Sequence, residues 1–587
     1  MQSRHEWKQE VLKTLRTMAE QESIDPEHVA ADMLPIEVPP KPELDDVAFP
    51  MFPFAKIFRR SPQDIAAQAK EALEQRGLDA HAEKLDNAGP YLNVGFHRSS
   101  FARSVLETVE KAGEAYGRNR SLAGRKVMVE FSSPNTNKPL HLGHLRNDAL
   151  GESVSRMLQA SGAEVRKANL INDRGIHICK SMLAYRRFGQ GSTPESEGLK
   201  PDHFVGKYYV KFAEWAEEDE TAEEQAQEML RLWEQGDPDT LELWRLMNGW
   251  VVRGIEQTYE HTGVSFDDIY YESRTYQLGR DEILRGLEQG VFYREEDGSV
   301  WVDLEDIGLD QKILLRRDGT SVYLTQDIGT AIQRQRDWPF DSLVYVVGSE
   351  QQYHFRVLFN VLERLGMEWA QNLYHLSYGM VNLPEGKMKS REGTVVDADD
   401  LIKELEDMAK EEIRSKEREA EVGDLNQTAS RVALAALHYY LLQSNPNRDM
   451  IFDPRESLSF TGNTGPYLQY VGARISSMLR KMGDERIPSV SEVDVDRLTV
   501  PEEWELVKRV AEFPERVEQA SRELNPAVVT GRLYEVAKNF SRYYHEHPIV
   551  TNSDPELRKA RLVLAVAVLR VLRNAFELTA IPFLETM

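Results

Sequence analysis

Residues 132–144 (SSPNTNKPLHLGH) bring together side chains that suit the binding of a phosphate group. His141 and His144 flank Gly143 at the point where the apolar spacing predicts that a helix begins. The amides and the dipole at the start of a helix attract phosphate, and a glycine permits close approach of the backbone. Imidazoles can donate hydrogen bonds to phosphoryl oxygens. The segment therefore predicts a phosphate-binding turn, although two ordinary histidines at a helix start would look the same.

A second segment with chemical potential lies far downstream, in residues 386–394 (GKMKSREGT). It is basic, it begins with a glycine and is predicted to be a loop. Lys387 and Lys389 could neutralise phosphate charge there, with Met388 between them. A basic loop on its own is more often solvated surface. Its position downstream of HLGH favours the functional interpretation.

Together, HLGH and GKMKS resemble the HIGH and KMSKS signatures of class I aminoacyl-tRNA synthetases. The second lysine stands one position early, so the role of Lys389 stays open, and Lys138 is the basic residue that could replace it, as in arginine enzymes of this class. A zinc-protease interpretation fails because the HExxH glutamate and spacing are absent. The resemblance implies catalytic roles for His141, Gly143, His144, Lys138, Lys387 and Lys389, and ATP binding by Pro134, Leu142, Gly143, His144, Lys387 and Met388.

Several residues could recognise the amino acid that such an enzyme activates. Arginine requires a planar anionic site, because its guanidinium presents a rigid fork of donors and stays charged. Tyr323 and Asp327 are four apart, so on a helix they would share a face. Gln351 follows a predicted strand at its carboxyl end, where α/β sheets bind ligands. Near the end of the first predicted strand stand Glu130, Ser133 and Asn135.

With VEFSSPN, YLTQDIG and GSEQQYHF added, the chain resembles the arginyl-tRNA synthetases over nearly its full length. The resemblance implies that Asp327 holds the guanidinium and that Tyr323 lines the side-chain pocket. Glu272, in YYESRTY, and Glu130 are further anionic candidates. Any one of these could instead be a structural polar residue. The polar end of the amino acid would be held by Ser133, Asn135, His144 and Gln351.

Two aromatic segments resemble the tRNA-binding parts of the same family. In GPYLNVG, Tyr91 and Asn93 lie two apart on a predicted strand and match a pair that reads a D-loop base. In GPYLQYVGAR, Tyr467, Tyr470 and Arg474 share a helical face and could contact splayed anticodon bases. For the second set, packing in a core is the competing explanation.

The elements that must position these residues indicate a multidomain α/β protein. Residues 126–131, a helix ending near Gly162, and residues 165–171 predict strand, helix and strand, the start of a parallel sheet. Further strands are expected at 321–324 and 343–347. The resemblance implies a Rossmann-type catalytic domain at 116–425 with a helical insertion at about 189–263, an N-terminal α+β tRNA-binding domain at 1–115, and an all-α, DALR-type anticodon-binding bundle at 426–587, with the charged stretch 403–421 near that boundary.

Composition narrows the class of protein. The chain has 587 residues, a net charge of −25 and one cysteine, Cys179, which excludes an internal disulfide and a multi-cysteine zinc site. The longest apolar run, residues 562–569, has eight members, well short of the ~20 that span a bilayer. We expect a cytoplasmic protein without zinc or membrane contact. The family implies ATP with Mg2+, L-arginine and tRNA(Arg) as partners, a monomer, and bound tRNA as a condition for activating arginine.

Three alternatives stay open. A class I synthetase for another amino acid would keep both signatures and change the pocket, although a cysteine enzyme is disfavoured because its zinc needs more thiols than Cys179 provides. A small adenylyltransferase shares HxGH but needs no anticodon-like bundle. A catalytically silent tRNA-binding paralogue would have broken signatures, whereas His141, Gly143, His144 and Lys387 are all present.

Overall fold

The computed structural model describes residues 2–37, 39, 45–77, 82–384, 396–417, 419, 422–482 and 486–587. The predicted loop with Lys387, Met388 and Lys389 lies outside these described residues. Contacts within the chain divide it into two units. The first comprises Met1–Gly117, Ile475–Arg516 and Glu535–Asn574, and the second comprises Arg118–Arg474, Val517–Tyr534 and Ala575–Met587.

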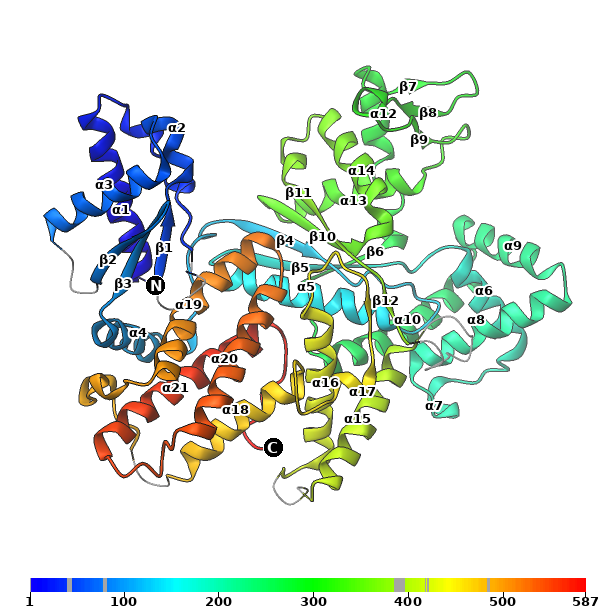
Figure 1. Cartoon of the computed structure of the whole chain (residues 1–587). Coiled ribbons are helices and arrows are strands. Elements are labelled where there is room, and N and C mark those ends of the chain that lie inside the picture. The colour runs from blue at the N-terminus through cyan, green and yellow to red at the C-terminus, as the bar shows by residue number, and fades with distance from the viewer. Residues whose placement is uncertain are drawn as a thin grey trace. The chain divides into compact units, whose positions relative to one another are not determined.

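A five-stranded parallel sheet forms the centre of the second unit (Figure 1). Its order is β11-β10-β4-β5-β6, so the chain runs from β4 to one side and later returns to the other side with β10. The apolar runs VMV and LVYV are buried, as strands covered on both faces must be. Ligands are expected where the strand order reverses, at the carboxyl ends of β4 and β10. The strands are β4 (Lys126–Glu130), β5 (Glu164–Ile171), β6 (Asp268–Tyr271), β10 (Ser342–Gly348) and β11 (Leu373–Tyr378).

Helices connect these strands, as the predicted strand-helix-strand start requires. Helix α5 (Leu142–Ala160) joins β4 to β5 and ends just before Gly162, at Ser161. Between β5 and β6 the chain is entirely helical apart from its turns, in agreement with the polar, helical pattern there. These helices are α6 (Ile176–Phe188), α7 (Pro194–Glu197), α8 (Pro201–Glu218), α9 (Ala222–Gln235) and α10 (Pro238–Thr262).

The prediction of a strand at 321–324 is wrong. Helix α13 (Tyr323–Asp337) begins there, and the preceding strand is β9 (Lys312–Leu315). A short apolar run cannot by itself distinguish a strand from the start of a buried helix. Helix α14 (Gln352–Arg364) then leads from β10 to β11. The elements between β6 and β9 are α11 (Glu272–Thr275), α12 (Arg280–Glu288), β7 (Tyr293–Arg294) and β8 (Val300–Val302), with β7, β8 and β9 forming an antiparallel sheet.

Beyond β11 the second unit becomes mainly helical. The charged stretch 403–421 falls largely within α15 (Ala398–Ser415), whose apolar face buries Leu405 and Ile413 and packs on α16 (Leu425–Leu442). The charges are therefore the outer face of an amphipathic helix. A parallel pair of short strands, β12 (Val381–Asn382) and β13 (Met450–Ile451), precedes α17 (Pro454–Ser457) and α18 (Gly465–Arg480).

The first unit contains an antiparallel sheet of order β1-β3-β2 together with α-helices, as predicted for an N-terminal α+β region. Among the described residues no helix has the length and apolar character needed to cross a membrane. The sheet strands are β1 (Val47–Pro50), β2 (Ala82–Ala88) and β3 (Tyr91–Phe96) and the N-terminal helices are α1 (Gln2–Gln21), α2 (Ala55–Phe58), α3 (Pro62–Arg76) and α4 (Arg98–Ala112). Toward the C-terminus, α19 (Pro501–Glu523), α20 (Ala527–Glu546) and α21 (Pro555–Leu578) supply residues to both units.

Candidate active site

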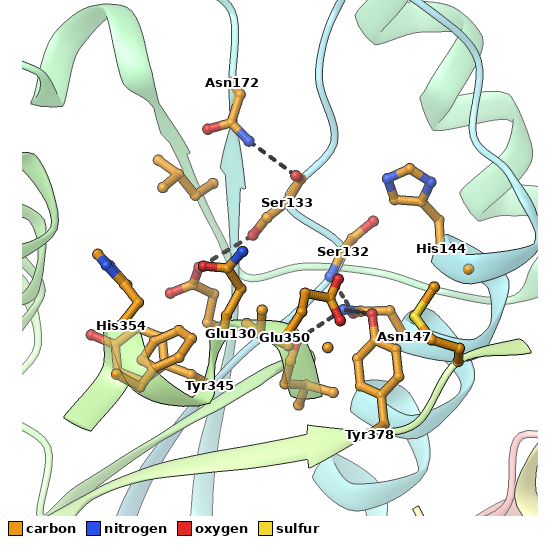
Figure 2. Close-up of a pocket in the computed structure, with 18 of the residues that line it drawn as sticks. Glu130, Ser132, Ser133, His144, Asn147, Asn172, Tyr345, Glu350, His354 and Tyr378 are labelled. Atoms are coloured by element: carbon orange, nitrogen blue, oxygen red, sulfur yellow. Dashed lines mark hydrogen bonds between the residues drawn. The ribbon is translucent and has the colours of Figure 1, made fainter. Parts of the chain in front are cut away.

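A cavity of about 710 Å³ opens in the second unit where β4 and β10 end (Figure 2). The start of α5 forms one part of its wall, and α13 and α14 form another. Residues separated by more than two hundred positions therefore meet at the reversal of strand order. Of the residues predicted from the sequence, the cavity is lined by Glu130, Ser133, His141, Leu142, Gly143, His144, Tyr323, Asp327 and Gln351.

The two histidines of HLGH cap the start of α5. The Gly143 amide donates to His141 Nδ1 at 3.1 Å, and the His141 amide donates to His144 Nδ1 at 3.2 Å. Each Nδ1 is thus an acceptor, so a neutral ring carries its proton on Nε2. Both rings therefore hold an Nε2–H donor that the cap does not use. This is the arrangement that donation to phosphoryl oxygens requires.

Burial keeps these imidazoles neutral. It lowers the pKa of His141 to about 4, with the positive charge of Lys138 adding to the effect. Burial, His141 and Lys138 hold the pKa of His144 well below its ordinary value. Gly143 is required between them, because a Cβ at this position would lie 2.9 Å from Cε1 of His141. The neutral Nε2–H groups of both histidines can therefore donate to an anion with no change in the protonation of the rings.

Two consecutive serines between β4 and this turn have a backbone conformation in the left-handed region. Ser132 has φ +70° and Ser133 has φ +49°, which is uncommon outside glycine. The Ser132 amide donates to Asn147 Oδ1 at 2.6 Å and the Ser133 amide donates to Asn169 Oδ1 at 3.1 Å. Asn172 Nδ2 donates to the Ser133 carbonyl at 3.0 Å, as Figure 2 shows. Amide side chains from α5 and β5 thus hold a strained turn at the cavity wall.

The acidic side of the cavity is built on α13. Tyr323 and Asp327 lie one turn apart, as predicted, and His354 Nε2 lies 2.7 Å from Asp327 Oδ2. The ring of Tyr323 stands 5.4 Å from that of His354. The negative charge of Asp327 raises the pKa of the Tyr323 phenol. An anionic group with a neighbouring aromatic ring suits a guanidinium.

Glu130 has a different environment from the one the sequence suggested. Its carboxylate forms an ion pair with Arg334, whose side chain is buried, and accepts a hydrogen bond from Ser133 Oγ at 3.2 Å. Its charge is therefore already compensated inside the protein. This geometry favours a role for Glu130 in holding Ser133 over direct binding of a cation.

Among the described residues, four further candidates for arginine or ATP are not part of the cavity lining: Pro134, Asn135, Lys138 and Glu272. Burial raises the pKa of Glu272 to about 7, and the charges of Asp173 and Asp327 add to that increase while Arg174 opposes it. Glu272 is thus electrostatically coupled to Asp327. Lys138 is half-buried and its charge acts on both histidines, whereas Asn135 is exposed and Pro134 is buried.

Several lining residues were not found from the sequence. Asn147 Nδ2 donates to the Val346 carbonyl at 2.7 Å and to Tyr378 OH at 3.1 Å, which ties α5 to β10 and β11. An amide side chain such as Asn147 on the apolar face of a predicted helix could have been recognised as a candidate from the sequence. His354 stands three positions after Gln351, in the quoted GSEQQYHF, and could have been found by that spacing. The other lining residues missed include Ser132, Arg334, Tyr345, Val347 and Glu350.

The residues predicted to contact tRNA lie outside this cavity. On β3, Tyr91 is half-buried and Asn93 is 2% exposed, so the asparagine is covered by its own unit. On α18, Arg474 Nη2 donates to Tyr470 OH at 2.5 Å and its guanidinium lies 4.6 Å from the ring centre. Tyr467 packs edge-on against Tyr534 at 6.2 Å. The shared helical face is present, and its role stays a prediction.

Family models match most of the chain. The model described as tRNA synthetases class I (R), catalytic domain, matches residues 107–454. The model of the arginyl tRNA synthetase N terminal domain matches residues 5–96, and that of the DALR anticodon binding domain matches residues 468–587.

Individual relatives agree with these models. The chain is 55% identical to the arginine–tRNA ligase of Treponema denticola over 99% of each chain, and 46% identical to that of Borrelia hermsii over 98% of each. Its structure is similar to the arginyl-tRNA synthetase of Thermus thermophilus, with a TM-score of 0.80 and 26% identity over 100% of both chains.

Proposed function

The chain belongs to the arginyl-tRNA synthetases, a family of class I tRNA synthetases, and from this premise we propose that its cavity is where arginine is activated with ATP for transfer to tRNA(Arg). The observation that carries the proposal is the pairing of two features in one cavity: the HLGH cap of α5 and the acidic group Asp327 on α13. One offers neutral N–H donors for phosphate, the other an anion for guanidinium. The protein is an aminoacyl-tRNA ligase.

In the first step the arginine carboxylate attacks the α-phosphorus of ATP. A carboxylate–phosphorus bond forms, the bond to the β-phosphate oxygen breaks, and pyrophosphate leaves. The Nε2–H groups of His141 and His144 can donate to the phosphoryl oxygens as negative charge develops, and the amides at the start of α5 add to this stabilisation. No side chain acts as a nucleophile, so positioning and electrostatics provide the acceleration.

In the second step the 2′-hydroxyl of the terminal adenosine attacks the carbonyl carbon of the adenylate, and AMP leaves. Ser133 and Gln351, which line the same cavity, are suited to hold the polar end of arginine through both steps. Asn135 is exposed and would have to act from the cavity mouth. Lys138 is suited to add positive charge beside the phosphates, since its field already reaches both histidines.

Mg2+ would enter with the triphosphate and neutralise part of its charge. Among the described residues, three carboxylates line the cavity, and two of them have partners: Glu130 pairs with Arg334 and Asp327 pairs with His354. Glu350 is therefore the lining carboxylate that best fits a phosphate-bound Mg2+. Lys387, Lys389 and Met388 belong to this proposal through their sequence resemblance alone.

We extend the proposal to the tRNA-facing regions and to the state of the protein. Residues 1–115 and 426–587 would bind tRNA on either side of a catalytic region at 116–425, with Tyr91 and Asn93 at the D-loop and Tyr467, Tyr470 and Arg474 at the anticodon. The matched family models support this division. A cytoplasmic monomer is expected.

The test is ATP–pyrophosphate exchange and aminoacylation with each of the twenty amino acids, with and without total tRNA. Arginine alone should support both reactions, and exchange should require tRNA. Exchange with a different amino acid would replace the substrate in this proposal. ATP–pyrophosphate exchange at full rate without tRNA would contradict only the proposed requirement for tRNA in the activation of arginine.

A further inference from the structure

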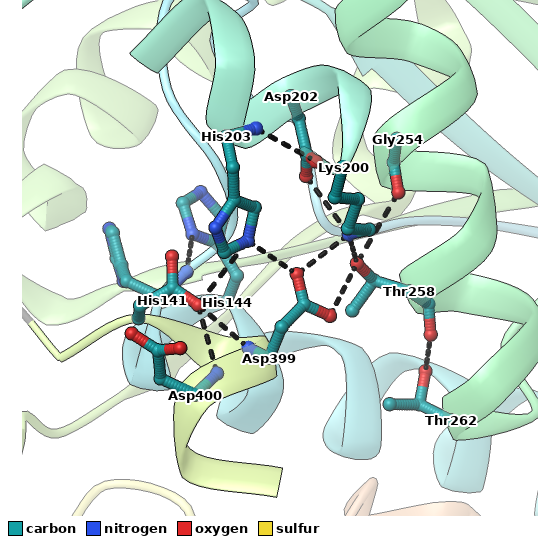
Figure 3. Close-up of polar contacts among 11 residues, drawn as sticks. His141, His144, Lys200, Asp202, His203, Gly254, Thr258, Thr262, Asp399 and Asp400 are labelled. Atoms are coloured by element: carbon teal, nitrogen blue, oxygen red, sulfur yellow. Dashed lines mark hydrogen bonds and ion pairs between the residues drawn. The ribbon is translucent and has the colours of Figure 1, made fainter. Parts of the chain in front are cut away.

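A polar cluster outside the cavity joins the insertion helices to the start of α15 (Figure 3). We call Lys200, Asp202, His203, Thr258 and Asp399 the Asp399 cluster. Lys200 Nζ lies 2.6 Å from Asp399 Oδ2 and 3.0 Å from Asp202 Oδ2, and it donates to Thr258 Oγ1 at 2.5 Å. Thr258 Oγ1 also donates to Asp399 Oδ1 at 3.1 Å. Both oxygens of Asp399 are thus held by residues from the insertion.

His203 on α8 connects the cluster to the cap of α15. Its Nε2 lies 2.9 Å from Asp399 Oδ2 and 3.6 Å from Asp397 Oδ1. Asp397 in turn accepts the amides of Asp399 at 2.9 Å and Asp400 at 3.1 Å, so it is the N-cap of the helix. The imidazole faces two carboxylates that fix how α15 begins.

The main chain just before α15 is paired with the HLGH turn. The Leu142 amide donates to the Val396 carbonyl at 2.9 Å, and the Ala398 amide donates to the Leu140 carbonyl at 3.0 Å. His141 and Asp397 are therefore bridge partners. Whatever holds residues 396–398 also holds the backbone on both sides of His141.

Close packing leaves the cluster little freedom. Asp202 is fully buried, and a Cβ on Gly254 of α10 would lie 2.4 Å from Asp202 Oδ1. The ligand atoms of Asp202, His203 and Asp399 lie within 4.8 Å of one another, as in a metal site. The ammonium of Lys200 already contacts both carboxylates and supplies the cation, so the cluster is a salt-bridge network.

The electrostatics favour a charged His203. Burial lowers its pKa, but the hydrogen bond to Asp399 and the charges of Asp397, Asp202 and Asp399 outweigh burial and raise it. Burial acts to raise the pKa of Asp399, yet His203 and Lys200 together lower it to about 2. The groups facing His203 are Asp397 and Asp399 from α15 and Asp202 from α8, with Lys200 beside them. The charge of His203 is present below its raised pKa and is lost as pH rises through that pKa.

We propose that His203 and Asp399 are positioning residues for adenylate formation: they fix residues 396–398 and, through the paired backbone, hold His141 and Leu142 at the start of α5. This inference rests on the proposed function, because it assigns His141 to the phosphate. Neither residue is part of the described cavity lining, so each acts through the backbone of another. The insertion thereby takes part in shaping the phosphate site.

The test compares Asp399→Asn with Asp400→Asn in the full-length protein. Both remove one negative charge from the first turn of α15, but Asp400 is exposed and its side chain is outside the cluster. In ATP–pyrophosphate exchange with arginine and tRNA, Asp399→Asn should lower kcat by about 10-fold to 100-fold with little change in the KM for arginine, as misplacement of a reacting group does. Asp400→Asn should match the wild type. Equal activity of the two variants overturns the inference.

Two further measurements separate a loss of positioning from a failure of the variant to fold. Hydrogen exchange followed by mass spectrometry should show faster exchange of peptides containing Leu142 and Ala398 in Asp399→Asn only, whether or not the enzyme is active. His203→Gln, measured if Asp399→Asn fails to fold, should remove the decline in kcat that the wild type shows as His203 loses its proton. The positioning role is contradicted if hydrogen exchange in Asp399→Asn and the pH profile of kcat in His203→Gln both match the wild type. A wild type with no arginine-dependent activity contradicts the proposed function instead, and the hydrogen-exchange result still decides the positioning.

Discussion

His354 Nε2 lies 2.7 Å from Asp327 Oδ2, and this contact joins α14 to α13 across the acidic side of the cavity. The imidazole occupies one oxygen of the carboxylate and fixes its orientation. Among the described contacts, none uses Oδ1, so this oxygen is the one proposed to accept from arginine. The pair forms an oriented anion, which is more selective for a planar guanidinium than a freely rotating carboxylate.

Asp327→Asn should therefore lose arginine recognition while keeping the fold. The substitution preserves volume but removes a charge-assisted hydrogen bond, worth about 3 kcal/mol and on the order of 100-fold in kcat/KM for arginine. The measurement is ATP–pyrophosphate exchange at varied arginine. His354→Gln, which keeps the charge of Asp327 and alters the contact that orients it, should cost about 10-fold or less. Normal arginine kcat/KM in Asp327→Asn would remove Asp327 from the binding site.

Glu272 should make the affinity for arginine depend on pH. Its pKa is raised to about 7 in the free protein, so below pH 7 it is mostly protonated and neutral. A bound guanidinium favours the charged form, hence the KM for arginine should fall as pH rises through about 7. Glu272→Gln should have a high KM that does not change over this interval. A wild-type KM that is flat between pH 6 and pH 8 would place Glu272 outside the reach of the substrate.

Arg146 should be essential for stability although none of its described hydrogen bonds is to a carboxylate. It is fully buried on α5 and donates to the carbonyls of Gly379 at 2.6 Å, Pro446 at 2.9 Å and Arg448 at 2.8 Å. Lysine cannot satisfy these acceptors with one ammonium group, so Arg146→Lys should lower the free energy of unfolding by about 2–4 kcal/mol. Urea denaturation measures this. Arg448→Ala is the control, because Arg448 contributes only its carbonyl to the contact.

The α18 face should bind tRNA and have no part in adenylate chemistry. Tyr470→Ala or Arg474→Ala should raise the KM for tRNA about 10-fold, the cost of one lost stacking or cation contact, while the KM values for ATP and arginine stay unchanged. Arg480→Ala removes a charge elsewhere on the same helix and is the comparison. Equal effects of Arg474→Ala and Arg480→Ala would mean that general charge is responsible, not this face.

The sequence predicted the helices and strands that depend on residues close together in the chain. Apolar spacing predicted α5, and apolar runs predicted β4, β5 and β10, since each of these patterns spans only a few neighbouring residues. The left-handed backbone of Ser132 and Ser133 had no such signal, because it depends on asparagines from α5 and β5. Long-range packing decided it.

Pairings between distant residues were beyond sequence reasoning. Glu130 was an anionic candidate because it ends the first predicted strand, beside Ser133 and Asn135. Its partner Arg334 reaches it only when α13 packs beside the sheet. Asn93 was predicted to share a strand face with Tyr91, but it lies on the central strand of its sheet and is covered. The order of the strands and the packing of the helices must be known before one can say which polar side chains are free to bind a ligand.

Asp148 should make stability fall with rising pH. It lies one residue after Asn147 on α5 and is fully buried; burial raises its pKa from 3.8 to about 8, an effect that Ser132 opposes and Glu152 reinforces. Between these two values the unfolded chain loses the proton and the folded chain keeps it, so each unit of pH costs the fold up to about 1.4 kcal/mol. Asp148→Asn keeps the neutral shape without a proton to lose, and its melting temperature should exceed that of the wild type by a margin that grows from pH 5 to pH 8. Glu164→Gln, an exposed carboxyl at the start of β5, should show no such growth. A constant difference between Asp148→Asn and wild type across this range would mean that Asp148 is ionised in the folded protein, and that a compensating cation lies beside it.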